Sequence, residues 1–122
     1  MNEPTLTPKS GLFRLKIELS YDGSDFAGWA KQPDQKTLQG EIESALTTIF
    51  GEKIESIVAG RTDAGVHATQ QYIHIDLPEN SQVENLVYRL NRILDADIRV
   101  LNSEKVSGDF HARFSAKSRK YI

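Results

Sequence analysis

Three side chains that can carry out chemistry lie close together in the stretch 60–68, whose sequence is GRTDAGVHA. They are the guanidinium of Arg61, the carboxylate of Asp63 and the imidazole of His67. Apolar runs precede and follow the stretch, so we expect it in the connection between two strands, where side chains are held by a rigid scaffold but remain reachable by a ligand. A carboxylate beside a guanidinium stays ionised and can act as a nucleophile or as a base.

An ordinary turn explains the same stretch without any chemistry. Asp63 can bond its own backbone and Gly65 can supply a left-handed residue, while an exposed pair of Arg61 and Asp63 contributes little to stability. A metal site at Asp63 and His67 is a weaker interpretation, because the chain has no cysteine and no second group of His or carboxylate residues at ligand spacing. The residue types alone favour the turn.

The wider sequence pattern changes this balance in favour of a catalytic site. Residues 60–67 resemble the active-site motif of the tRNA pseudouridine synthase A family, and three further blocks, two before this motif and one after it, occur in that family's order. These blocks are Tyr21-Asp22-Gly23-Ser24 with Phe26, Gly28, Trp29 and Gln32; Thr37-Leu38-Gln39 with Glu41; and Asp109-Phe110-His111-Ala112-Arg113-Phe114-Ser115-Ala116 with Arg119-Lys120-Tyr121. The resemblance runs from about Phe13 to the last residue, and four ordered blocks are far more specific than one.

The resemblance implies that Asp63 is the catalytic aspartate of pseudouridine formation, in which uracil leaves ribose C1′ through N1 and rejoins it through C5. It leaves open whether the carboxylate attacks C1′, adds to C6 of the base or removes a sugar proton. Arg61 is expected to keep Asp63 ionised. Tyr121 matches the family's active-site tyrosine, whose ring can stack on the flipped uracil. The reaction is an isomerisation, so neither a cofactor nor a metal is expected.

The partner that the resemblance implies is tRNA, modified in its anticodon stem-loop and bound across both subunits of a homodimer. A net charge of −2 gives this no support, but no acidic residue follows Asp109, and basic residues there alternate with rings that can stack on bases. A strand with one solvated basic face is the alternative. The residues expected to contact RNA are Trp29, Gln32, His67, His111, Arg113, Lys117, Arg119 and Lys120; for the tryptophan, packing on the core is the commoner role.

Composition describes one globular domain. The chain has 122 residues, of which 39% are hydrophobic and 26% charged. No apolar run has the length of a membrane span, and the N-terminus lacks the apolar core of a signal peptide. The absence of cysteine suits a reducing compartment, and no glycine-rich fingerprint for a nucleotide cofactor is present. We therefore expect a cytoplasmic protein that does not bind a membrane.

Hydrophobic periodicity predicts an α+β fold with a ferredoxin-like β-α-β-β-α-β order, in which the helices cover one face of an antiparallel sheet. Strict alternation over 13–21 predicts a half-buried strand with Arg14 on its polar face. Thr37 and Gly51 are placed to begin and end a helix over 38–50. A capping box of Ser81 and Glu84 predicts the start of a second helix.

The remaining strands are expected over 54–60, 69–77, 98–106 and 114–122. His74 alternates with the apolar residues of its strand and is expected to be solvated. Strands joined through a helix are expected to be parallel neighbours.

Two parts of different character are expected along the chain. Residues 1–12 are polar and without period, which predicts a disordered tail. Residues 13–122 are expected to form the N-terminal, catalytic-aspartate half of a pseudouridine synthase, truncated at its C-terminal end, with weak tRNA binding and little or no activity. A non-catalytic ferredoxin-like RNA-binding module is the main alternative, and a small-molecule-binding or regulatory domain is a weaker one.

Overall fold

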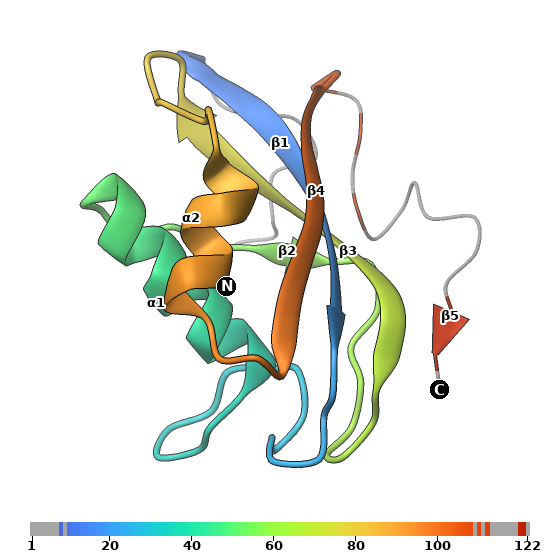
Figure 1. Ribbon diagram of the computed structural model, residues 1–122. Coiled ribbons are helices and arrows are strands. Elements are labelled where there is room, and N and C mark those ends of the chain that lie inside the picture. The colour runs from blue at the N-terminus through green and yellow to red at the C-terminus, as the bar shows by residue number, and fades with distance from the viewer. Residues whose placement is uncertain (1–7, 9, 109, 111, 113–119, 122) are drawn as a thin grey trace.

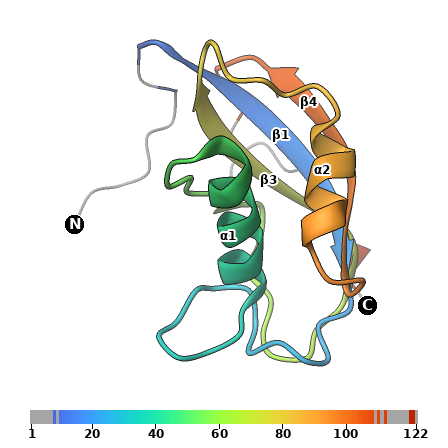
Figure 2. The same ribbon diagram turned by 60° about the vertical axis from the view of Figure 1, so that its left-hand side comes forward.

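The computed structural model describes residues 8, 10–108, 110, 112, 120 and 121, the last two by their backbone. These residues form β1 (Leu12–Tyr21), α1 (Leu38–Phe50), β2 (Ile57–Val58), β3 (Ala68–Pro78), α2 (Leu86–Ile93), β4 (Ile98–Val106) and β5 (Lys120–Tyr121) (Figure 1). Both helices cover one face of a single sheet, so the fold is α+β as expected (Figure 2). Neither helix of the described part is long and apolar enough to cross a membrane.

The sheet has the ferredoxin-like strand order β2-β3-β1-β4, and β5 pairs with β3. Every pair of neighbouring strands is antiparallel. The expectation of parallel neighbours was therefore wrong. The two strands that a helix joins are parallel, but β3 lies between β1 and β2, and β1 lies between β3 and β4. Each helix thus passes over one intervening strand, which places β1 and β3 at the centre of the sheet.

The alternation predicted for the first strand is confirmed on the face that the helices cover. Leu15, Ile17 and Leu19 of β1 are almost completely buried in the core. They share that core with Ile73 and Ile75 of β3 and with the apolar side of α1. Burying side chains of this size stabilises the fold by about 1.5–3 kcal/mol each. The C-terminal end of β1 and the N-terminal end of β3 are consequently firmly held, and the connections discussed below start from them.

Helix α1 begins and ends where the sequence predicts. The Oγ1 atom of Thr37 accepts a hydrogen bond from the Gly40 N–H at 3.1 Å, which satisfies one of the free N–H groups of the first turn. Gly51 follows the last turn with a φ of 74°, and its N–H donates to the Thr47 carbonyl at 2.8 Å. Local capping chemistry is sufficient to define this helix.

The start of helix α2 was predicted wrongly. The helix begins at Leu86, and its N-cap residue is Asn85 with a φ of 60° and no capping hydrogen bond from its side chain. A turn in which the Leu86 N–H donates to the Val83 carbonyl precedes it. The left-handed backbone that Asn tolerates at position 85 separates this turn from the helix, so Ser81 and Glu84 lie outside it.

The second face of the sheet is covered in part by the chain that follows β4, which makes two expectations wrong. Arg14 is buried, with its guanidinium bound to the Asp76 carboxylate at 2.8 and 2.9 Å and to the Phe110 carbonyl at 2.7 Å. His74 is buried as well, and its Nδ1 accepts the Ala112 N–H at 3.0 Å. Alternation correctly placed both residues on this face, but it gave no information about what covers the face.

One strand is shorter than predicted, because β2 contains only Ile57–Val58 where a strand over 54–60 was expected. β5 is described at Lys120–Tyr121, where it pairs with the start of β3. The remainder of the strand predicted over 114–122 and most of the tail predicted over 1–12 lie outside the described residues.

Candidate active site

The stretch 60–68 connects β2 to β3, as the sequence predicts. At its centre the Val66 N–H donates to the Asp63 carbonyl at 3.2 Å, and Gly65 has a φ of 79°. A turn is therefore present, and Gly65 supplies its left-handed residue. We call residues 60–68 the Asp63 loop.

The connection that follows β1 packs against this loop backbone to backbone. The Trp29 N–H donates to the Thr62 carbonyl at 2.9 Å. A Cβ atom at Gly28, whose φ is 108°, would lie 3.0 Å from that carbonyl oxygen. A Cβ atom at Gly23 would lie 2.0 Å from the Val66 carbonyl oxygen, a distance that no side chain tolerates. The absence of a side chain at these two positions is what lets the two segments approach.

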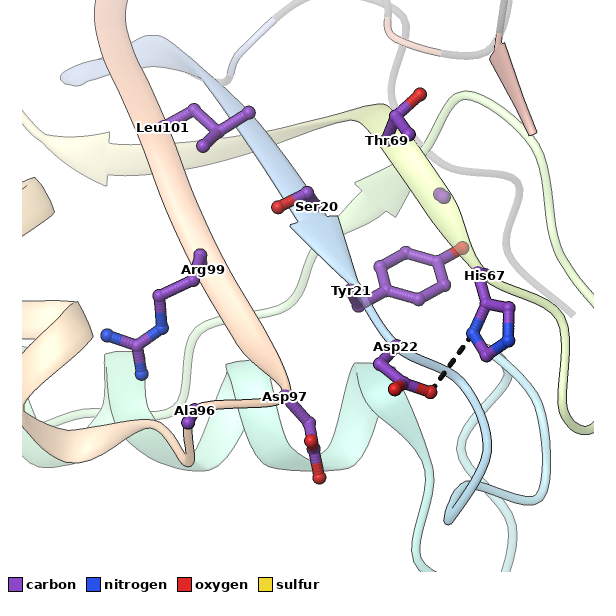
Figure 3. Close-up of a pocket in the computed structure, with 10 residues that line it drawn as sticks. Ser20, Tyr21, Asp22, His67, Thr69, Ala96, Asp97, Arg99 and Leu101 are labelled. Atoms are coloured by element: carbon purple, nitrogen blue, oxygen red, sulfur yellow. Dashed lines mark ion pairs between the residues drawn. The ribbon is translucent and has the colours of Figure 1, made fainter. Parts of the chain in front are cut away.

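His67 links the C-terminal end of the Asp63 loop to the connection that follows β1. Its Nδ1 atom accepts the Gly23 N–H at 2.9 Å and lies 3.0 Å from Oδ1 of Asp22 (Figure 3). The neutral ring with its lone pair on Nδ1 satisfies the backbone donor, whereas the protonated ring would pair with the carboxylate. This contact gives His67 a structural role, whereas the sequence was used to predict that it contacts RNA.

The carboxylate of Asp22 is fixed mainly by its own turn. Oδ1 accepts the Ser24 hydroxyl at 2.6 Å and the Ser24 N–H at 3.0 Å. These two hydrogen bonds, with a smaller contribution from the nearby His67 ring, lower the pKa of Asp22 below its ordinary value. Asp22 is thus held in its ionised form beside the end of the Asp63 loop.

The side chains of Asp63 and Arg61 are exposed. The ion pairs of the described residues do not include one between them, so the expected pairing of guanidinium and carboxylate is absent from this structure. Their backbone is nevertheless fixed on both sides, by Thr62 between them and by the turn after Asp63. The backbone that carries the carboxylate is therefore restrained, and the exposed carboxylate is open to a ligand.

The structure places the two residues expected from the first connection very differently. Trp29 is only 1% exposed and packs on Tyr21, with ring centroids 5.9 Å apart. Its burial contradicts the expected RNA contact and agrees with the core role that was weighed against it. Gln32 is exposed on the connection between β1 and α1.

The remaining expected residues belong to the end of the chain. His111, Arg113, Lys117 and Arg119 lie outside the described residues, as do the side chains of Lys120 and Tyr121. The backbone of Tyr121 is nevertheless paired with Ala68, the last residue of the Asp63 loop. The register of β5 therefore brings the position of Tyr121 to the same end of β3 as the Asp63 loop.

An open pocket of about 590 Å³ lies beside the Asp63 loop, where β1, β3 and β4 come together. Asp22 and His67 border it, and Asp63 and Arg61 do not (Figure 3). The lining consists of Ser20, Tyr21, Asp22, His67, Ala68, Thr69, Ala96, Asp97, Arg99 and Leu101. Within the described part of the chain, no group of three or more His, Asp or Glu residues is arranged to hold a metal ion.

Sequence reasoning missed one residue that supports the Asp63 loop. Gln71 is completely buried, and its Nε2 donates to the Gly60 carbonyl at 2.9 Å and to Tyr21 Oη at 3.3 Å. A signal for it exists in the sequence. Position 71 is two residues before Ile73 and four before Ile75, so it shares their face of the strand, and a polar residue on this core-facing side requires partners.

Comparison with known proteins agrees with these features. A family model described as tRNA pseudouridine synthase matches residues 19–115. The chain is 48% identical over 113 residues to a tRNA pseudouridine synthase A of Frankia casuarinae, covering 92% of the chain and 41% of that protein. It is 49% identical over 113 residues to a protein of the same name from Dictyoglomus thermophilum, covering 91% of the chain and 46% of that protein. The chain thus spans less than half the length of these curated relatives.

Proposed function

Because this chain belongs to the tRNA pseudouridine synthase family, we propose that it supplies the catalytic aspartate, Asp63, of an enzyme that converts uridine into pseudouridine in the anticodon stem-loop of tRNA. The observation that carries this proposal is the state of Asp63 itself. Its carboxylate is exposed, while Thr62 before it is bonded to the buried residues Trp29 and Tyr21, and the turn after it is closed by the bond from the Val66 N–H to the Asp63 carbonyl. A carboxylate that is carried by a restrained backbone and has no ion pair among the described residues is suited to act on a substrate.

The proposed reaction is an isomerisation that balances without a second substrate. The bond from N1 to C1′ breaks and a bond from C5 to C1′ forms. The C5 hydrogen leaves as a proton and N1 gains one, so the product is an isomer of the substrate. A carboxylate can serve by attacking C1′, by adding to C6 or by removing a sugar proton, and each route requires Asp63 to be ionised and close to the nucleotide.

Arg61 and Tyr121 complete the proposed site. Arg61 is exposed one residue before Thr62 and, without an ion pair to Asp63, its guanidinium is available for a phosphate of the RNA. The pairing of Tyr121 with Ala68 supports a place for the tyrosine beside the flipped uridine. The reacting nucleotide must leave its stack, because C1′ and C5 are otherwise inaccessible.

The wider RNA contacts belong to the same proposal. We assign them to Gln32 and to His111, Arg113, Lys117, Arg119 and Lys120, whose side chains combine positive charge, hydrogen-bond donors and a ring. A homodimer in the cytoplasm that binds tRNA across both subunits is part of this proposal. The 122 residues alone are expected to show little or no activity, because the relatives with this name are more than twice as long as the part matched here.

Tritium release tests the proposed function directly. A tRNA transcript labelled with 5-tritiated uridine is incubated with the protein at its natural length, and joining C5 to the ribose releases the label. Release is expected from the parent and not from Asp63→Asn, which keeps the size of the side chain and removes its charge. Asp95→Asn is the matched control, since its ion pair with Lys36 is 3.5 Å long and exposed.

Equal release by Asp63→Asn and the parent would remove Asp63 from the mechanism. If the folded parent binds tRNA but releases no label, the proposed enzymatic activity is refuted and a non-catalytic RNA-binding module is favoured.

A further inference from the structure

A chain of hydrogen bonds runs from the core to both sides of Arg61. Nε2 of Gln71 donates to the Gly60 carbonyl at 2.9 Å and to Oη of Tyr21 at 3.3 Å. The same Tyr21 oxygen lies 2.9 Å from Oγ1 of Thr62. The chain therefore connects the residue before Arg61 with the residue after it, and Thr62 is the residue that directly precedes Asp63.

The two core residues from which these hydrogen bonds start are buried. Gln71 has no exposed surface and Tyr21 is 4% exposed. The Oε1 atom of Gln71 accepts the Tyr72 N–H at 3.2 Å, which fixes the amide so that its NH₂ group points to Gly60 and Tyr21. An amide that is satisfied at both ends has one stable orientation, and a buried polar group in this state is costly to rearrange.

Thr62 receives a second contact from the neighbouring connection. Its carbonyl accepts the Trp29 N–H at 2.9 Å, and the Trp29 ring packs on the Tyr21 ring. The side chain of Thr62 is thus held by the Tyr21 hydroxyl and its main chain by the backbone N–H of Trp29, and the rings of these two core residues contact each other. Two attachments on one residue restrain both its position and its rotation, whereas the backbone bond alone would leave it able to pivot.

On the basis of the proposed function, we propose that Tyr21 and Gln71 are positioning residues for Asp63, acting through the hydroxyl of Thr62. They touch neither substrate nor reacting atoms. The Tyr21–Thr62 hydroxyl pair holds the residue that precedes Asp63 in one position, so that the backbone carrying the carboxylate needs no reorganisation when the nucleotide arrives. Removing the pair leaves the carboxylate present but loosely placed, and a displacement of about 1 Å can reduce turnover by about a hundredfold.

Removal of single oxygen atoms tests this proposal in the protein at its natural length. Tyr21→Phe and Thr62→Val each delete one hydroxyl and keep the shape, and both are expected to lower kcat for tritium release by about tenfold or more. KM for tRNA is expected to stay within about twofold, because ground-state binding is untouched. The double variant is expected to be no slower than either single one, since the two hydroxyls act as one unit.

Matched variants separate positioning from simple loss of stability. Thr62→Ser restores the hydroxyl without the methyl group and is expected to retain most of the parent kcat. Tyr88→Phe removes a hydroxyl from an exposed tyrosine of α2 and should change nothing. Kinetics are measured well below the unfolding midpoint of each variant. Variants that melt earlier but keep the parent kcat would overturn the proposal and leave the pair a purely structural role.

Hydrogen exchange of the amides of residues 61–66 distinguishes failure of this proposal from failure of the proposed function. Faster exchange in Tyr21→Phe and Thr62→Val, but not in Thr62→Ser, supports the positioning role even if the parent releases no tritium. Unchanged exchange together with an active parent would refute the positioning role alone.

Discussion

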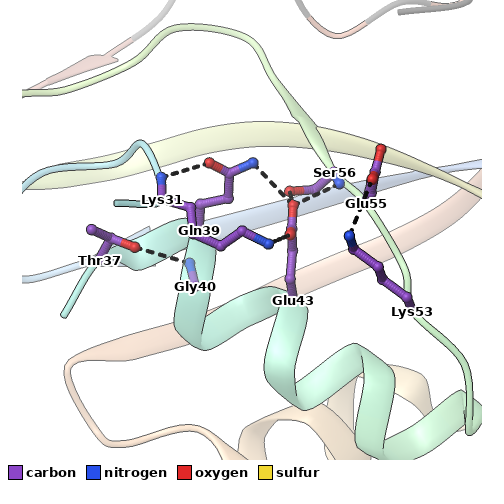
Figure 4. Close-up of polar contacts among 8 residues, drawn as sticks. All are labelled: Lys31, Thr37, Gln39, Gly40, Glu43, Lys53, Glu55 and Ser56. Atoms are coloured by element: carbon purple, nitrogen blue, oxygen red, sulfur yellow. Dashed lines mark hydrogen bonds and ion pairs between the residues drawn. The ribbon is translucent and has the colours of Figure 1, made fainter. Parts of the chain in front are cut away.

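The carboxylate of Glu43 on α1 and the carboxylate of Asp63 in the Asp63 loop are held in opposite ways. Glu43 is 5% exposed and accepts hydrogen bonds from Nζ of Lys31, Nε2 of Gln39 and both N and Oγ of Ser56, at 2.9 to 3.0 Å (Figure 4). Asp63 is exposed, and its contacts among the described residues are made by its backbone. At Glu43 the fold uses the charged carboxylate for its hydrogen bonds. At Asp63 the contacts among the described residues use only the backbone.

This difference indicates which carboxylate serves the structure. Glu43 joins α1 to the segment before β2 and to the connection that follows β1, so it fixes three parts of the chain at once. A buried charge can exist only with such partners. The Asp63 loop is stabilised without using its carboxylate, and the charge remains available to a ligand. Four predictions test the contrast.

Glu43→Ala is expected to have the largest effect on stability. It leaves the Ser56 N–H and the Gln39 amide without their acceptor and should lower the free energy of unfolding by about 3 kcal/mol. Urea unfolding followed by circular dichroism measures this. Glu55→Ala is the control, because its ion pair with Lys53 is 3.8 Å long and both side chains are exposed. A loss below that of the control would show that the network around Glu43 is dispensable.

Gly23→Ala is expected to damage the Asp63 loop more than the rest of the fold. The new Cβ would lie 2.0 Å from the Val66 carbonyl oxygen, so the two backbones must separate. We expect a stability loss of at least about 2 kcal/mol and reduced tritium release by the protein that remains folded. Gly51→Ala provides the comparison, since it strains a φ of 74° where nothing lies within 4 Å. That variant should lose about 1 kcal/mol and keep its activity. Equal activity in both variants would contradict the close packing of the loop.

Asp63→Asn is expected to leave stability unchanged within about 0.5 kcal/mol, because none of the ion pairs among the described residues involves this carboxylate. The same urea unfolding measures it, and circular dichroism should show an unaltered fold. Combined with the loss of tritium release, an unchanged unfolding midpoint would separate function from stability at this residue. A marked loss of stability would instead show that the carboxylate has a structural partner, and the contrast with Glu43 would disappear.

Ser24→Ala is expected to have the smallest effect. It removes the hydroxyl that contributes most to the lowered pKa of Asp22, so that pKa should move up towards its ordinary value near 3.8. An NMR titration of the carboxyl carbon records the change. A lowered pKa stabilises the fold above the unfolded-state value, and this contribution is lost as the pH falls through the folded-state value. Compared with the parent, the variant should therefore have a slightly lower free energy of unfolding at neutral pH. It should lose less of that free energy as the pH falls through the folded-state pKa. An unchanged pKa would refute the role of Ser24.

The sequence predicted most of the elements because their signals are local. Alternation over β1 and β3, the cap at Thr37 and the glycine at position 51 each act within a few residues, and the structure confirms all of them. The prediction of where α2 starts was wrong for a local reason as well. A turn closed by the bond from the Leu86 N–H to the Val83 carbonyl, together with the left-handed backbone at Asn85, lies where the first helical turn was predicted.

The sequence by itself determined which residues belong to the candidate site. These are Asp63, Arg61 and His67, which lie on one connection between two strands of an α+β fold. Only the tertiary structure decided how that connection is held. The burial of Trp29 and Gln71, the steric need for Gly23, and the cover over Arg14 all depend on segments far apart in the chain. Periodicity states which face of a strand a residue occupies. Whether that face meets solvent, a neighbouring loop or the chain's own end is fixed by long-range packing, which a local pattern does not contain.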